Sequence, residues 1–91
     1  MTRQLVFETV YNGNAGTVSA RPMIREHDDM MNEKWSYKPH RMAWDYSLDT
    51  TDNHALAVRY SCRGALQKDP VSIEWGGESV KGKFWIVTVT Q

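Results

Sequence analysis

The dominant pattern along this chain is a strict alternation of apolar and polar positions, which is typical of β-strands. Leu5 to Val10 and Thr17 to Ile24 both follow this period of two. Between them lies Asn12-Gly13-Asn14-Ala15-Gly16, a run of residues that tolerate positive φ and favour a hairpin loop. The first quarter of the chain therefore predicts two antiparallel strands joined by a short loop.

The clearest alternation occurs in the middle of the chain. Residues 41–48 and 56–62 each alternate, and the polar run Asp49-Thr50-Thr51-Asp52-Asn53 separates them, so we predict a second hairpin. Six side chains of this hairpin should then share one buried face: Met42, Trp44, Tyr46, Leu56, Val58 and Tyr60.

A third hairpin is predicted near the C-terminal end, from residues 71–75 and 84–90 around a Gly76-Gly77 turn. Together the pattern predicts one all-β domain over residues 1–91, with five to six antiparallel strands. So few short strands can form a small barrel or a strongly bent sheet, since both reduce exposed strand edges.

Residues 25–38 interrupt this regular pattern. The segment is polar, charged and methionine-bearing, and it predicts a long loop with at most one helical turn. Long loops in small domains frequently carry function. Apolar side chains that we expect to be partly exposed there are candidates for contact with a partner protein: Met30, Met31, Trp35 and Tyr37.

Charge balance, cysteine content and the lengths of apolar runs limit the kinds of protein that this chain could be. Eleven Lys and Arg residues balance eleven Asp and Glu residues, so no electrostatic excess marks a general nucleic-acid binder. With Cys62 as the single cysteine, an internal disulfide is excluded, and a reducing compartment is favoured. No secretory signal or membrane-length apolar run is present, so we expect a cytoplasmic protein without a membrane partner.

Several short clusters invite a catalytic or metal-binding interpretation. His27-Asp28-Asp29 lacks the ligand spacing of a metal site, and Gly76-Gly77 lacks the strand–loop–helix context of a phosphate site. His40, His54, Ser61 and Cys62 lack the local signatures of catalytic cysteines or serines. We therefore predict no catalytic residue, no metal and no cofactor.

Arginines on predicted strands suggest a binding face. Arg21, Arg41 and Arg59 could gather near aromatic side chains, an arrangement suited to phosphate and base contacts. The alternative is that these arginines solubilise the outer face and pair with Asp45 or Glu8.

The order of features over residues 5–62 resembles the WYL domain, in its compact stand-alone form. The matching features are a strand ending in Tyr11, a turn ending in Gly16, Arg21 on the return strand, then Trp35, Pro39, a strand through Tyr46, an acidic turn at Leu48-Asp49 and a strand with Ala57. The Trp-Tyr-Leu triplet is absent, Trp35-Ser36-Tyr37 being nearest, and His54 falls near a family arginine. The resemblance implies an SH3-like barrel, with Tyr11, Arg21 and Tyr46 on its ligand face.

Two functional hypotheses follow. The first is a non-enzymatic, regulatory binding module that recognises nucleic acid or a nucleotide-like ligand through Tyr11, Arg21, Arg41, Tyr46 and Arg59. The alternative is a small inhibitor or adaptor, of the kind that phages and mobile elements encode, that binds a host protein through residues 25–38 and an exposed strand edge.

Overall fold

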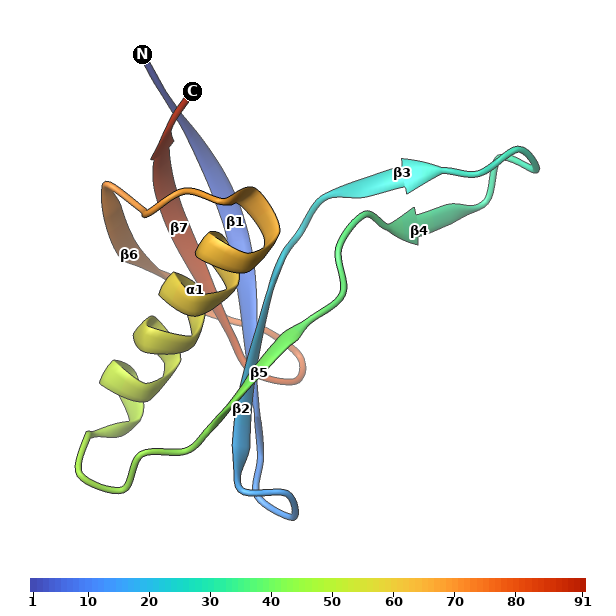
Figure 1. Ribbon diagram of the computed structural model, residues 1–91. Helices are drawn as coiled ribbons and strands as arrows, with labels where there is room; N and C mark the ends of the chain where they lie inside the picture. The colour runs from blue at the N-terminus through green and yellow to red at the C-terminus, as the bar shows by residue number, and fades with distance from the viewer.

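The computed structural model describes all residues 1–91, which form seven strands and one helix. The main sheet has five antiparallel strands in the order β5-β2-β1-β7-β6, and α1 covers one of its faces (Figure 1). A separate two-stranded sheet, β3-β4, projects away from it (Figure 1). In chain order the elements are β1 (Thr2–Asn12), β2 (Thr17–Pro22), β3 (Arg25–His27), β4 (Glu33–Trp35), β5 (His40–Ala43), α1 (Thr50–Leu66), β6 (Ser72–Glu78) and β7 (Lys83–Thr90).

The predicted small, mostly-β fold with a five-stranded antiparallel sheet is confirmed. The first and last hairpins, β1-β2 and β6-β7, lie where the alternation predicts them. The turn predicted at Gly76-Gly77 was wrong: both glycines lie within β6, beside an irregularity in the pairing with β7, and the chain turns between Ser79 and Gly82. In the loop of the first hairpin, Asn12 Oδ1 accepts hydrogen bonds from the backbone N–H groups of Asn14 and Ala15, and Gly16 has a φ of +65°. The sheet is open, because the strand order ends at β5 on one side and β6 on the other.

The main correction is α1, a helix of 17 residues that includes the segment 56–62, predicted to be a strand. The helix begins after Asp49, whose carboxylate accepts a hydrogen bond from the backbone N–H of Asp52 at 2.7 Å. It ends at Gln67, which adopts a left-handed backbone and donates its N–H to the carbonyl of Arg63. The WYL resemblance also places a strand in this region, where the structure has the helix.

The buried side of α1 recurs at helical spacing and faces the sheet. Its buried residues are Asn53, His54, Ala57, Val58, Ser61 and Cys62. Leu56 and Tyr60 point to the other side and are exposed, and Tyr46 lies in the loop before the helix with 83% of its surface exposed. The predicted common buried face was therefore wrong for these three residues, because it assumed a period of two. Val58 is fully buried, and Met42 and Trp44 pack at the margin of the core.

The core lies between α1 and the covered face of the sheet. Its nine buried apolar residues are Phe7, Val18, Ala20, Ala57, Val58, Cys62, Trp85, Val87 and Val89. Small residues on the helix and β-branched residues on the strands allow the two layers to pack closely. The helix is neither long nor apolar enough to cross a membrane.

Asn53 connects the helix to the loop that precedes it. Its side-chain Nδ2 lies within hydrogen-bonding distance of the carbonyls of Asp45, Leu48 and Asp49, at 2.9, 3.3 and 3.0 Å. Its Oδ1 accepts the backbone N–H of Asp45 at 2.8 Å. One fully buried carboxamide thereby fixes the path of the chain from β5 to α1.

Residues 25–38 are the second correction. They form no helical turn; instead β3 and β4 pair in register, Arg25 with Trp35 and His27 with Glu33. We call residues 25–35 the arm. The segment was predicted as a loop because its polar composition hides the strand period when neither face is buried.

Candidate functional site

The five residues predicted to bind a ligand do not gather on one face. Arg21 and Arg41 both lie on the sheet face opposite α1, on the neighbouring strands β2 and β5. Tyr11 is on the covered face, with its ring centroid 4.4 Å from that of Trp44. Arg59 is on α1, and Tyr46 stands in the exposed loop before that helix.

Arg21 is occupied by contacts within the protein. Its guanidinium carbon lies over the indole of Trp35, 4.0 Å from the ring centroid, and its Nη2 is 4.0 Å from Glu8 Oε1. Of the two arginines on the face opposite α1, Arg41 alone makes no ion pair. The main role of Arg21 that the geometry supports is to join the sheet to the arm.

The base of the arm is built around Trp35. The guanidinium groups of Arg21 and Arg25 both lie over its ring, each 4.0 Å from the centroid. Arg25 also pairs with Glu33 at 3.0 Å across the arm. A cation–π contact of this kind contributes about 0.5–1 kcal/mol at an exposed site, so these contacts stiffen an arm that has no core of its own.

The tip of the arm is a tight turn organised by Asp28. Its Oδ1 accepts hydrogen bonds from the backbone N–H groups of Met30 and Asn32, both at 2.9 Å. Its own backbone accepts from Met31 N–H at 2.9 Å and donates to the Asn32 carbonyl at 3.1 Å. Met31 adopts a φ of +62°, a left-handed conformation that is uncommon for methionine.

This turn holds two methionine side chains in solvent. Met30 is 79% exposed and Met31 is 74% exposed. Trp35 and Tyr37, the other two predicted contact residues, are half-buried near the base. The structure thus separates the predicted partner-binding set into an exposed pair at the tip and a supporting pair at the base.

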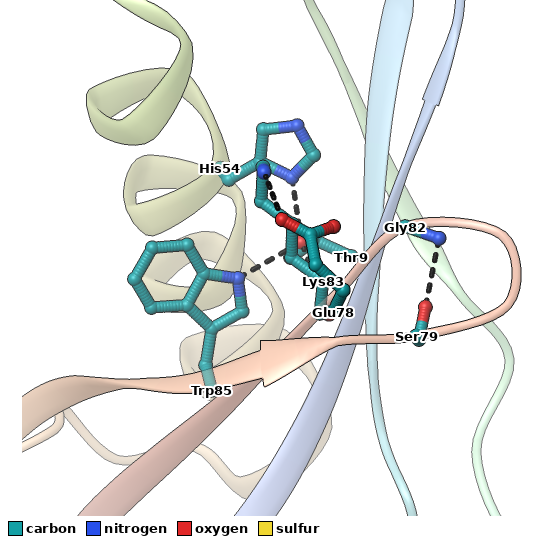
Figure 2. Close-up of polar contacts among 7 residues, drawn as sticks. All are labelled: Thr9, His54, Glu78, Ser79, Gly82, Lys83 and Trp85. Atoms are coloured by element: carbon teal, nitrogen blue, oxygen red, sulfur yellow. Dashed lines mark hydrogen bonds and ion pairs between the residues drawn. The ribbon is translucent and has the colours of Figure 1, made fainter.

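A buried polar cluster links the helix to the sheet (Figure 2). The hydroxyl of Thr9 lies 2.6 Å from His54 Nδ1 and 2.9 Å from Trp85 Nε1. Since an indole N–H only donates, the Thr9 oxygen accepts from Trp85, and the Thr9 hydroxyl has two acceptors within reach, His54 Nδ1 and the Lys83 carbonyl 3.4 Å away. The ring nitrogen of His54 that carries the proton is set by which of these two acceptors the Thr9 hydroxyl takes.

The electrostatic surroundings of His54 favour its neutral form. Burial lowers the pKa of His54, and the positive charge of Lys83 lowers it further, while Glu78 opposes the shift. The turn between β6 and β7 closes over the cluster, and a Cβ on Gly82 would lie only 1.8 Å from the Thr9 carbonyl oxygen. Thr9 is fully buried, so its hydroxyl is out of reach of a substrate, and the cluster's role is structural.

The other side chains considered for catalysis or metal binding are also buried or engaged in structural contacts. Cys62 is fully buried, and the pKa of its thiol is raised by burial and then by Asp69, opposite to the shift that activates a cysteine nucleophile. In the arm, Asp28 accepts the backbone hydrogen bonds that form the tip through its carboxylate. No group of three or more His, Cys, Asp or Glu side chains is arranged to hold a metal ion.

One surface feature was not predicted from the sequence. A groove of about 640 Å³ lies between β5 and α1, lined by His40, Met42, Leu56, Arg59, Tyr60, Arg63 and Gly64. The helical lining residues Leu56, Arg59, Tyr60 and Arg63 follow the spacing i, i+3, i+4, i+7 of a single helix face. That spacing is visible in the sequence, but it was obscured by the assignment of the segment as a strand.

Comparison with known proteins adds no relative. No protein-family model matches the chain, and no curated protein or solved structure is significantly similar to it. The WYL resemblance stays a prediction, and function is argued below from the geometry of this protein alone.

Proposed function

We propose that this protein is a non-enzymatic protein-binding module whose arm inserts its tip into a partner protein, acting as an inhibitor or adaptor. The observation that carries this proposal is the pair Met30 and Met31, held in solvent by a hydrogen-bonded turn. Methionine is flexible and polarizable, so it adapts to irregular apolar pockets on a partner surface.

The backbone of the tip supports the same proposal. A left-handed methionine is disfavoured by about 1–2 kcal/mol, whereas glycine or asparagine at this position would be tolerated. Strain of this kind is a known feature of binding sites, where the side chain is needed in a fixed direction. The Met31 side chain is 74% exposed and packs into no core, so we infer that it is kept for binding.

The charge distribution favours this function over nucleic-acid recognition. The chain has no net positive charge, and Arg21 is already stacked on Trp35 and close to Glu8. Nucleic-acid binding draws much of its affinity from the release of counterions by several free cationic side chains. The arginine face would need Arg41 to supply most of that interaction.

The test is capture of a partner from nuclease-treated host lysate by the immobilised protein. The double variant Met30→Ser/Met31→Asn removes both apolar side chains, and asparagine suits the left-handed position. A matched control, Val71→Ser/Val80→Asn, makes the same kind of change at two other exposed apolar positions, 62% and 102% exposed. Thermal melting of all three proteins verifies that each one folds.

We expect a stoichiometric protein to be captured by the wild type and the control, and lost by the tip variant. Central apolar side chains usually carry most of the binding energy, so the loss should exceed tenfold in affinity. Retention of the partner by the tip variant would show that the arm is not the contact. Capture that disappears on nuclease treatment would instead support the nucleic-acid hypothesis.

A further inference from the structure

The groove between β5 and α1 is a second surface, independent of the arm tip. Its floor is apolar, with Met42 from the strand and Leu56 and Tyr60 from the helix, and both helix residues are substantially exposed. His40 closes one end, where its ring packs so tightly against Gly64 that a Cβ there would lie 2.5 Å from Nε2. The groove is therefore a formed feature of the fold, with a glycine that makes room for one wall.

The strand wall of this groove has a free edge. β5 is at the end of the sheet and pairs only with β2. Trp44 N–H donates to the Gly16 carbonyl at 2.9 Å, and the register then directs the backbone groups of Met42 and His40 toward β2. Because antiparallel hydrogen bonds alternate along a strand, the N–H and C=O groups of Arg41 and Ala43 face outward.

The charge of the groove is positive. Arg59 and Arg63 stand on its helix wall, and no carboxylate is among the lining residues. Arg63 pairs with Asp69 beside the groove, whereas Arg59 makes no ion pair in the protein. An unpaired guanidinium at the rim of an apolar groove is complementary to a carboxylate on an extended apolar segment.

We propose that this groove binds an extended, acidic segment of a protein partner, which adds a strand to the outer edge of β5. The backbone of the segment bonds to Arg41 and Ala43. Its alternate side chains enter the groove over Leu56 and Tyr60, and an acidic side chain pairs with Arg59. Strand addition at a sheet edge beside a helix provides affinity through the backbone and selectivity through the side chains.

The probe is an array of capped nine-residue peptides in which every second residue is β-branched except for one, which is glutamate, so that the acidic side chain enters the groove on the same face as the apolar ones; the intervening residues are threonine. A twin array carries glutamine at every glutamate position. The full-length protein is applied at low salt, and the tightest acidic peptide is then titrated with the wild type, Arg59→Glu and the charge-matched control Arg3→Glu, whose site is outside the groove. The tip variant Met30→Ser/Met31→Asn is titrated in parallel.

We expect acidic peptides to bind better than their glutamine twins, with affinity reduced tenfold or more by Arg59→Glu and unchanged by Arg3→Glu. The tip variant should bind the peptide like the wild type, so a failure of the arm proposal leaves this result intact. A scan of N-methyl groups along the peptide probes the unaltered protein. Loss of binding should alternate with position, because only every second N–H faces β5.

Three results would overturn the proposal. The first is equal binding of acidic and glutamine peptides, including no binding by either. The second is an Arg59→Glu variant that binds within twofold of the wild type. The third is an N-methyl scan without alternation, which would show that the peptide does not bind as an added strand.

Discussion

Thr9→Val tests the buried cluster that joins α1 to the sheet. Valine matches threonine in shape and replaces the hydroxyl by a methyl group. In the folded protein this leaves Trp85 Nε1–H and His54 Nδ1 without their shared partner. Both side chains stay buried, so water cannot substitute for the lost hydroxyl without opening the core.

The magnitude follows from the two groups that lose a partner. A buried polar group left unpaired costs about 1–3 kcal/mol, so the loss of two partners should lower the free energy of unfolding by about 2–6 kcal/mol. A chain of this length is stable by roughly 5–14 kcal/mol. At about 4–8 °C per kcal/mol, the thermal midpoint should fall by roughly 8–48 °C.

Urea unfolding followed by tryptophan fluorescence measures this change, with circular dichroism melting as a second probe. Thr9→Ser is the matched control, because it keeps the hydroxyl and removes one methyl group, for a loss of about 1 kcal/mol. If Thr9→Val unfolds within about 0.5 kcal/mol of the wild type, the hydroxyl does not hold the cluster together.

Three further predictions concern single groups in the core and its margin. The pKa of His54 is lowered in the folded protein, so below the ordinary value of 6.5 the unfolded chain binds a proton at this residue while the folded protein does not. The free energy of unfolding should therefore fall as pH drops below 6.5, and this group contributes at most about 1.4 kcal/mol per pH unit. His54→Gln should flatten that part of the urea-unfolding pH profile, and an unchanged slope would assign it to other groups. Cys62, with its raised pKa and full burial, should react with a thiol reagent only after urea is added, and fast reaction in buffer would contradict its burial. Asn53→Ala should lower the free energy of unfolding by about 1–3 kcal/mol in the same urea assay, since it removes the hydrogen bonds to the loop before α1. An unchanged free energy of unfolding would mean that this loop keeps its conformation without Asn53.

The strand pairs at the two ends of the chain could be predicted because their burial follows a period of two. β1, β2 and β7 each bury one face against α1, so Phe7, Val18 and Val87 alternate with partly exposed residues. The signal is strong wherever a strand has one covered face. These three strands make up the centre of the sheet.

The helix was missed because its sequence carries both periods. Leu56, Val58, Tyr60 and Cys62 alternate with small or polar residues, which favours a strand. The buried set instead follows positions 53, 54, 57, 58, 61 and 62, which fits a helix. The acidic start at Asp49-Thr50-Thr51-Asp52 and the stop before Pro70 were the deciding signals, and they were interpreted as a turn and a connector.

The candidate sites were predictable only in part. The exposure of Met30 and Met31 follows from their place in a polar segment, and the structure agrees. The engagement of Arg21 by Trp35 does not follow, because it depends on how the base of the arm packs against the sheet. Charge and residue type identify an arginine as a candidate, but its free or occupied state is decided by tertiary contacts.

The groove and the misassigned helix have a common physical origin. A strand at residues 56–62 would pair with residues 41–48 and satisfy the outer edge of β5. Because the segment is a helix, that edge stays unpaired, and Leu56 and Tyr60 come to line a groove beside it. Exposed edges promote unwanted pairing, and proteins limit this by keeping them short and charged. β5 has only four residues, and the Arg41 side chain places a charge on the sheet face opposite α1, so the edge is short and partly charged, while its side toward α1 stays open to an acidic strand.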